Sequence, residues 1–272
     1  MKFLKIISIW ILGILITVGA AVFQRMTGPT TPYKEKISLA DKTIDLKLSR
    51  SLETSNHDGF LIKITEPNIS GIVYYRAHPS NDVFVIDSLQ KTDEGLFVPI
   101  TAQKAAGKIM YQIILTDDVN SYESPFVIAR YKNPVPSTWL TLHILFMFIA
   151  MLCAVVAGLK AIFNHKNHAK TLIWSGVLLF IGGMILGCIV QKYAFGVYWS
   201  GVPFGWDLTD NKTLLIVLLF AFAIWRNYKK TSRLWTIIAA TGLLFIYFIP
   251  HSLFGSELDH ETGKVTTAKT IE

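Results

Sequence analysis

The chain has 272 residues, of which 51% are hydrophobic and 17% charged, and its formal net charge is +7. The mean hydropathy of +0.42 is too high for an ordinary soluble domain and indicates membrane-spanning helices, so the lipid bilayer is an expected partner. A basic excess can also serve nucleic-acid binding. Here every basic cluster adjoins an apolar run, which indicates membrane topology, and we expect no nucleic-acid partner.

The first element is an uncharged apolar run from Ile6 to Phe23 behind a basic start. It could be the apolar core of a signal peptide. It is long, however, and no clear small-x-small cleavage site precedes Gln24. We therefore predict that residues 1–23 form an uncleaved N-terminal transmembrane anchor.

The segment 24–136 predicts a separate β domain. It contains short runs rich in β-formers, several of which alternate apolar and polar residues, as in "TIDLKLS" and "FLIKIT". Turn signals such as "NHDG" and "TDEG" separate these runs. The pattern favours an all-β sandwich of the immunoglobulin or fibronectin type, and it contains no catalytic constellation. We expect a partner protein to dock on this sandwich or on the membrane bundle.

Residues 137–255 predict a four-helix transmembrane bundle, which makes five transmembrane helices with the anchor. The four predicted spans are Thr138–Leu159, Thr171–Gln191, Thr209–Trp225 and Leu234–Pro250. In the fourth of these five spans, Lys212 is expected to snorkel outward if the helix begins near Thr209. Gly182, Gly183 and Gly187 give the Thr171–Gln191 span a face of small residues, which predicts close helix packing.

The positive-inside rule assigns an orientation to these spans. The basic clusters are Lys2 and Lys5; Lys160, Lys166 and Lys170; and Arg226, Lys229, Lys230 and Arg233. Five spans place all three on one face. We predict a multi-pass protein of the plasma (inner) membrane with a cytoplasmic N-terminus. The sandwich, the Trp-rich loop and a flexible tail at 256–272 are then extracytoplasmic, and His165 and His168 are expected near cytoplasmic headgroups.

The outer loop at 192–211 holds two tryptophans, three glycines, a proline and two aspartates. Trp199 and Trp206 are explained by an aromatic belt at the membrane boundary. Gly196 and its neighbours indicate a defined loop conformation. Asp207 or Asp210 can cap the following helix. The same combination of aromatic rings and a helix N-terminus can also receive a planar ligand that bears acidic groups.

Two histidines are predicted at a similar depth on the same side. His143 lies just inside the outer end of the second span, and His251 follows Pro250 at the end of the last span. Ionisable residues at membrane depth usually face a bundle interior or a ligand, and two neutral imidazoles are a common axial pair for haem iron. Alternatively, His251 lies among headgroups and His143 bonds a neighbouring helix.

The arrangement over residues 138–258 resembles the haem-handling membrane proteins of cytochrome c assembly, which carry an outward WWD motif. Gly196, Trp199, Trp206 and Asp207 match that motif, while Phe195 stands at the position of its first tryptophan. His143 and His251 match the flanking histidines. The resemblance implies that the loop contacts haem and that these two histidines ligate its iron.

The sequence therefore leaves three hypotheses open. The first is a haem-binding or redox-linked membrane component, with His143, His251, Trp199, Trp206, Gly196 and Asp207 as cofactor-binding residues. The second is a non-enzymatic membrane scaffold whose sandwich docks a partner protein. The third is a quinone-binding respiratory subunit that uses the same outer pocket.

Overall fold

The computed structural model describes residues 2–56, 58–249, 256–258 and 265–267. The chain divides into two compact units. The helical unit comprises Met1–Pro29, Val135–Gly255 and Thr267–Glu272, and the β unit comprises Thr30–Pro134 and Ser256–Thr266. Each unit has a hydrophobic core of its own.

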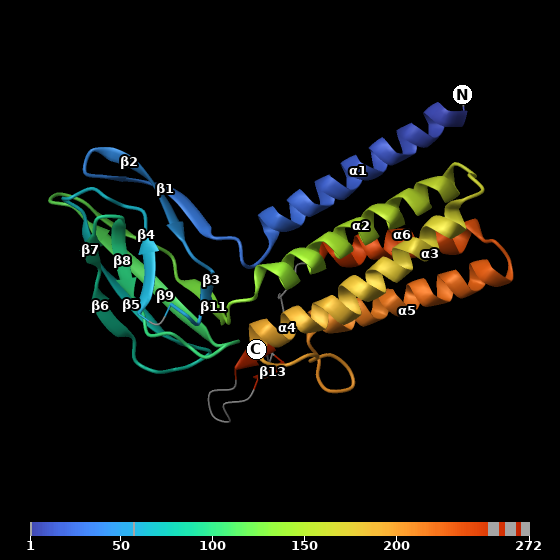
Figure 1. Ribbon diagram of the computed structural model, residues 1–272. Coiled ribbons are helices and arrows are strands. Elements are labelled where there is room, and N and C mark those ends of the chain that lie inside the picture. Colours follow the sequence, from blue (N-terminus) through green and yellow to red (C-terminus); the bar gives the residue numbers. More distant parts are fainter. Residues whose placement is uncertain (1, 57, 250–255, 259–264, 268–272) are drawn as a thin grey trace. The chain divides into compact units, whose positions relative to one another are not determined.

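The helices of the helical unit follow the apolar runs of the sequence. They are α1 (Lys2–Thr27), α2 (Ser137–Ile162), α3 (His168–Leu179), the π-helix η1 (Phe180–Leu186), α4 (Gly187–Phe195), α5 (Leu208–Lys229) and α6 (Arg233–Phe248). Because α3, η1 and α4 follow one another without a break, they form a single long rod (Figure 1). Within the described residues, four helical stretches are long and apolar enough to cross a membrane, and α6 is a shorter apolar helix. The protein is thus a membrane protein.

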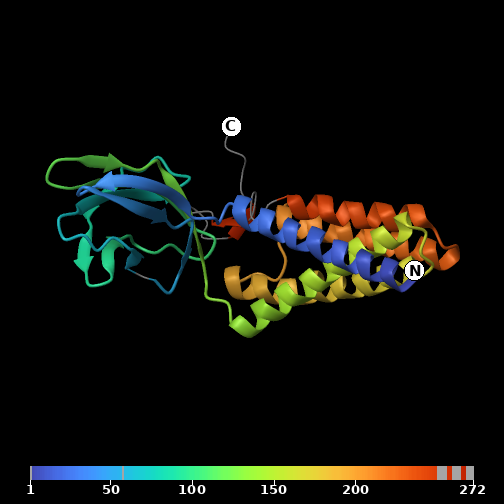
Figure 2. The same ribbon diagram turned by 90° about the horizontal axis from the view of Figure 1, so that it is seen from above.

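Small residues allow these helices to approach closely. Figures 1 and 2 show α2, α3, α5 and α6 side by side, and α1 runs along α2 and α6. A Cβ built on Gly182 would lie 3.1 Å from Met147 Sδ of α2, and one on Gly183 would lie 2.9 Å from Thr213 Cγ2 of α5. The predicted close packing of this glycine face is confirmed, because both neighbouring helices occupy the space that a side chain would need.

The β unit consists of short strands that follow the alternating runs. They are β1 (Tyr33–Leu39), β2 (Lys42–Leu48), β3 (Ser51–Glu53), β4 (Gly59–Ile62), β5 (Ser70–His78), β6 (Val85–Ser88), β7 (Gln90–Thr92), β8 (Gly95–Pro99), β9 (Lys108–Thr116), β10 (Ser121–Glu123), β11 (Val127–Lys132), β12 (Ser256–Leu258) and β13 (Val265–Thr267). The predicted β region after the first helix is therefore present.

The strands form open sheets. One sheet has the order β3-β11-β9-β5-β6, with β10 paired to β9, and a three-stranded sheet has the order β4-β8-β7. The β1–β2 hairpin and the β12–β13 pair are two-stranded sheets. Among strands β1 to β11, the described pairs are antiparallel except the parallel pair β3–β11.

The core of the β unit is built by period-two alternation. In β9, Ile109, Tyr111, Ile113 and Leu115 are fully buried, whereas the residues between them are partly exposed. These side chains belong to one apolar cluster with residues of the three-stranded sheet and of the β1–β2 hairpin. The buried Tyr111 hydroxyl donates a hydrogen bond to Ser49 O over 2.8 Å, so it does not lack a partner in the core. Burial in this core raises the pKa of Tyr111.

A carboxylate fastens the β1–β2 hairpin to the turn between β9 and β10. Asp117 accepts hydrogen bonds from the Ala40 amide at 2.6 Å and from the Val119 amide at 2.7 Å, and a further one from the Asn120 amide. These donors favour the ionised form and lower the pKa of Asp117 to about 2. Ala40 and Asp41, at the tip of the hairpin, both have positive φ, as a tight hairpin turn requires.

The C-terminal region contains more structure than a flexible tail. Sequence reasoning assigned 256–272 to such a tail, but Ser256–Leu258 and Val265–Thr267 pair as strands, and Leu258 is buried. Its amide donates to Ala106 O over 3.2 Å, so this segment packs on the loop that precedes β9. Val265–Thr267 is rich in β-formers, but strands of three residues are too short for a periodic pattern to predict.

Candidate functional site

The loop between α4 and α5, residues 196–207, is where sequence analysis placed the candidate site, and its two ends are helix caps. Gly196 ends α4 with a φ of +81°. A Cβ built there would meet nothing within 4 Å, so the glycine serves the left-handed conformation and not a close approach. Asp207 begins α5 by accepting from the amides of Thr209 at 2.8 Å and Asp210 at 3.2 Å. The predicted helix cap is therefore Asp207.

Asp210 organises the middle of the loop, a role that sequence reasoning did not assign. Its side chain is only 6% exposed. Oδ2 accepts from the Ser200 amide at 2.6 Å, from the Ser200 hydroxyl at 3.1 Å and from Gln191 Nε2 at 3.0 Å. Gln191 Nε2 also donates to the Ser200 hydroxyl at 2.7 Å. Because three donors converge on one buried carboxylate oxygen, the loop is tied to both α4 and α5.

The tryptophans of the loop have unlike environments. Trp199 is half-buried, and its indole N–H donates to Val202 O over 3.1 Å. A Cβ built on Gly201 would lie 3.0 Å from the Trp199 ring and 2.8 Å from Asn211 Oδ1, so the glycine is required for close packing. Trp206, in contrast, is 75% exposed. The two indoles therefore differ in how much of their surface is open to a ligand or to lipid.

The position of Lys212 differs from the predicted one. It was expected to snorkel outward, but it is only 6% exposed and donates to Ile249 O, at the C-terminal end of α6, over 2.8 Å. A cation is favourable at a helix C-terminus, where backbone carbonyls have no partner in the helix. The side chain therefore turns into the bundle and links α5 to α6.

His143 of α2 lies against the π-helix η1, in the middle of the α3-η1-α4 rod. Its Nδ1 lies 2.9 Å from Gly182 O, and a Cβ built on Gly187 would be 3.5 Å from the imidazole Cε1. Because a carbonyl can only accept, Nδ1 carries the proton, and Nε2 of the neutral ring has the free lone pair. Histidines that ligate metals commonly donate their other nitrogen to a backbone carbonyl in this way. π-Helical turns are also frequent at functional sites.

The second predicted ligand, His251, lies outside the described residues. The hydrogen bond of His143 goes to the Gly182 carbonyl and not to the loop. Among the described residues, no group of three or more His, Cys, Asp or Glu side chains could hold a metal ion. Of the two predicted ligands only His143 is described, and its bond to Gly182 O agrees with the alternative in which it bonds a neighbouring helix. Gly196, Asp207 and Trp199 each have a structural role in the loop.

A second polar cluster lies at the opposite end of the bundle, where α3 and α6 begin. His168 was expected near headgroups, but it is buried and its Nδ1 lies 3.0 Å from the Thr236 hydroxyl. Asn227 Nδ2 approaches the same hydroxyl at 3.3 Å. Lys160 is also buried and donates to the Thr171 hydroxyl over 2.9 Å. These bonds connect α2, α3, α5 and α6 and explain the residues as structural.

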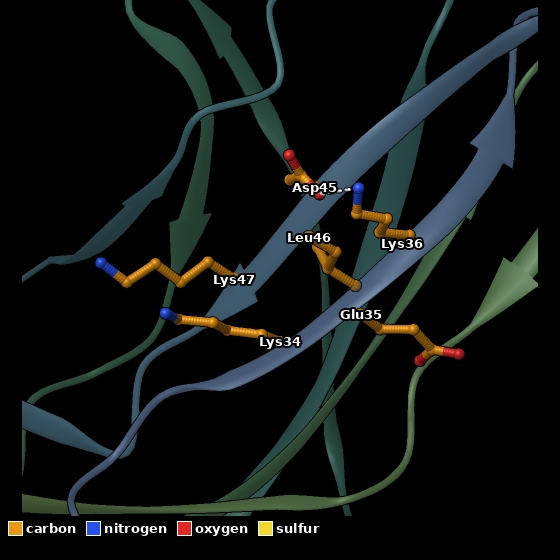
Figure 3. A pocket seen from close by; sticks show the side chains of 6 residues that line it. All are labelled: Lys34, Glu35, Lys36, Asp45, Leu46 and Lys47. Carbon is orange, nitrogen blue, oxygen red and sulfur yellow. Dashed lines mark ion pairs between the residues drawn. The ribbon is translucent and has the colours of Figure 1, made fainter. Parts of the chain in front are cut away.

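A pocket of the β unit lies on the β1–β2 hairpin and has a volume of about 480 Å³. Figure 3 shows its lining side chains, which are Lys34, Glu35, Lys36, Asp45, Leu46 and Lys47. The Lys36–Asp45 ion pair across the strands is long, at 3.9 Å, and both side chains are well exposed. Hydrogen bonds from Tyr122 and Tyr33 lower the pKa of Glu35 and engage its carboxylate. We assign this open surface no chemistry.

Comparisons with known proteins identify no relative. No family model, no curated protein and no solved structure matches the chain.

Proposed function

We propose that the protein is a non-enzymatic membrane scaffold whose β unit docks a partner protein. In this proposal the β unit is a sandwich of the immunoglobulin or fibronectin type on the extracytoplasmic side, and the five apolar helices anchor it. The positions of the basic clusters support that sidedness. The observation that carries the proposal is a group of exposed apolar side chains on the outward face of the sheet β3-β11-β9-β5-β6.

This face consists of the residues that alternate with the buried core positions. Tyr74 of β5 pairs with Ile86 of β6 on one side and with Gln112 of β9 on the other. In the next row, Met110 of β9 pairs with Ile128 of β11. Ile86 is 56% exposed and Ile128 is 43% exposed. Outward positions of a solvated antiparallel sheet are normally polar, so apolar side chains in neighbouring rows need a partner surface.

Aromatic residues and an arginine extend the same face. The rings of Phe84 and Phe126 lie 5.3 Å apart, and the Arg76 guanidinium lies 4.5 Å from the Phe84 centroid. Arg76 Nη1 also donates to Asp82 O over 3.2 Å, which holds the segment before β6 against the sheet. The adjacent Val83 is 90% exposed. Aromatic residues and arginine are enriched at protein–protein interfaces, which favours a protein as the occupant.

Site-specific photocrosslinking in native membranes tests the proposal. A benzophenone amino acid at Ile86 should give one discrete protein adduct, and Phe126→Glu in the same chain should abolish it. The matched control carries the same probe at Glu94, an exposed turn residue between β7 and β8. Equal adducts at both positions, or an Ile86 adduct that survives Phe126→Glu, would refute docking on this face.

A second candidate, haem binding similar to that of cytochrome c assembly proteins, is favoured by the hydrogen bond between His143 Nδ1 and Gly182 O. That bond orients the ring and leaves Nε2 as the atom able to ligate iron. Bound haem would supply redox chemistry, with His251 as the other proposed ligand and Trp199 and Trp206 beside the porphyrin.

Absorption spectroscopy tests this candidate. The protein is purified in detergent from cells supplied with haem, and oxidised and reduced spectra are recorded. A Soret band that is lost in both His143→Ala and His251→Ala supports haem binding. If the wild-type protein is colourless and elutes as a single folded species, haem binding is rejected and the scaffold function is retained.

A further inference from the structure

The loop 196–207 begins and ends at helices that are apolar and long enough to span a membrane. The rod α3-η1-α4 ends at Phe195, and α5 starts at Leu208. Exposed apolar side chains continue from the loop onto both helices, as Tyr193 of α4 and Leu215 of α5 show. The loop is therefore continuous with the surface that these helices present to lipid.

Several backbone amides of the loop are paired within the loop or with the first turn of α5. The amides of Phe204 and Gly205 donate to Gly201 O over 2.9 and 3.0 Å, and the Asp207 amide donates to Ser200 O over 3.0 Å. The Val202 amide donates to Asn211 Oδ1 over 2.7 Å. A non-helical segment can enter a lipid environment only when such groups are paired, because unpaired ones cost several kcal/mol.

The exposed side chains of the loop are large and apolar or amphipathic. Phe204 is 82% exposed and Tyr198 is 60% exposed, in addition to Trp206. The one carboxylate of the loop, that of Asp207, is buried. Lys192 of α4 lies with its ammonium 5.2 Å from the Tyr198 ring centroid. Tryptophan and tyrosine beside lysine, with no exposed carboxylate, is a composition that suits the interfacial layer of a phospholipid bilayer.

We infer that the loop 196–207 inserts its exposed aromatic side chains into the headgroup layer of the bilayer as a rigid lipid-binding platform. The occupant of this surface is phospholipid. The network around Asp210 holds the platform at a fixed position relative to α4 and α5, so the loop sets the depth of both helices. This inference is independent of what the β unit binds.

Tryptophan quenching in proteoliposomes tests the inference on the full-length purified protein. Vesicles of phosphatidylcholine contain a lipid brominated near the headgroup, a lipid brominated near the end of the acyl chain, or neither. The emission of Trp206 is the difference between the wild type and Trp206→Phe, which keeps an apolar ring at the site. The matched control is Trp199→Phe, which removes an indole that donates within the loop.

The expected result is that the Trp206 emission is quenched by the lipid brominated near the headgroup, more than by the other lipid, and is protected from aqueous iodide. Trp206→Phe should lose this quenching component, and Trp199→Phe should retain it. Quenching of Trp206 by iodide with no effect of either bromolipid would overturn the inference, because the loop would then lie in water. Protection from all three quenchers would also overturn it, because a protein surface would then cover the loop.

Discussion

Replacing Asp210 by alanine removes the acceptor on which the loop network converges. The change deprives Ser200 of two hydrogen bonds and Gln191 of one. A bond to a charged acceptor contributes about 1.5–3 kcal/mol, and part of this is recovered when the donors find other acceptors. We therefore expect a loss of about 2–4 kcal/mol. Asp210→Asn keeps an acceptor oxygen but loses the charge, and it should cost about half as much.

The assay is the midpoint of thermal unfolding in detergent, followed by the size-exclusion profile of heated samples. At about 2–4 °C per kcal/mol for a chain of this size, Asp210→Ala should melt roughly 4–16 °C below the wild type, with Asp210→Asn in between. Asp93→Ala, which removes an exposed turn carboxylate, is the control and should leave the midpoint unchanged. If Asp210→Ala melts with Asp93→Ala, the network does not hold the loop and the reasoning is wrong.

Three further predictions follow from other contacts. Asp117→Asn should lower the stability of the β unit at pH 5, and the difference from the wild type should disappear as the pH falls from about 4 to 2. The folded-state pKa of Asp117 is lowered to about 2, so the ionised carboxylate stabilises the fold above the unfolded-state pKa, and this stabilisation is lost through that range. Thermal midpoints of both proteins at pH 5 and pH 2.5 check the sign. Phe220→Ala should cost about 3–5 kcal/mol, because the ring is buried among the helices and leaves a cavity; Phe222→Ala, at a more exposed position of the same helix, is its control in detergent melts. Gly183→Leu should separate α5 from the π-helix, because a Cβ there already meets Thr213 at 2.9 Å, and a reduced yield of monodisperse protein would be the readout, with unchanged yield as the contrary result.

The sequence predicted the course of the chain through helices and strands because hydrophobic period and length carry that information. Apolar runs of spanning length predicted α1, α2, the α3-η1-α4 rod and α5, and the alternation of apolar and polar residues predicted the β region. The π-helix at Phe180–Leu186 was not predicted, and its glycines contact His143 and Met147 of α2. Such packing depends on neighbouring helices and leaves no local pattern.

The position of the candidate site was predicted, but the hydrogen bonds within it were not. The capping role of an aspartate could be read from its place before α5. The bond from Lys212 to Ile249 and the bonds from Gln191 and Ser200 to Asp210 join segments that lie apart in the sequence. Polar residues next to an apolar run were therefore interpreted as facing headgroups, although Lys212 and His168 face the bundle.

The brevity of α6 has a consequence for the surrounding lipid. Its 16 residues rise about 24 Å, whereas the 26 residues of α2 rise about 39 Å. A hydrocarbon layer of about 30 Å matches the longer helix when that helix tilts, but it exceeds the shorter one. If α6 crosses the bilayer, local thinning of the membrane, snorkelling of flanking residues or oligomerisation must relieve this mismatch, and a membrane that is already thin needs the least of these adjustments.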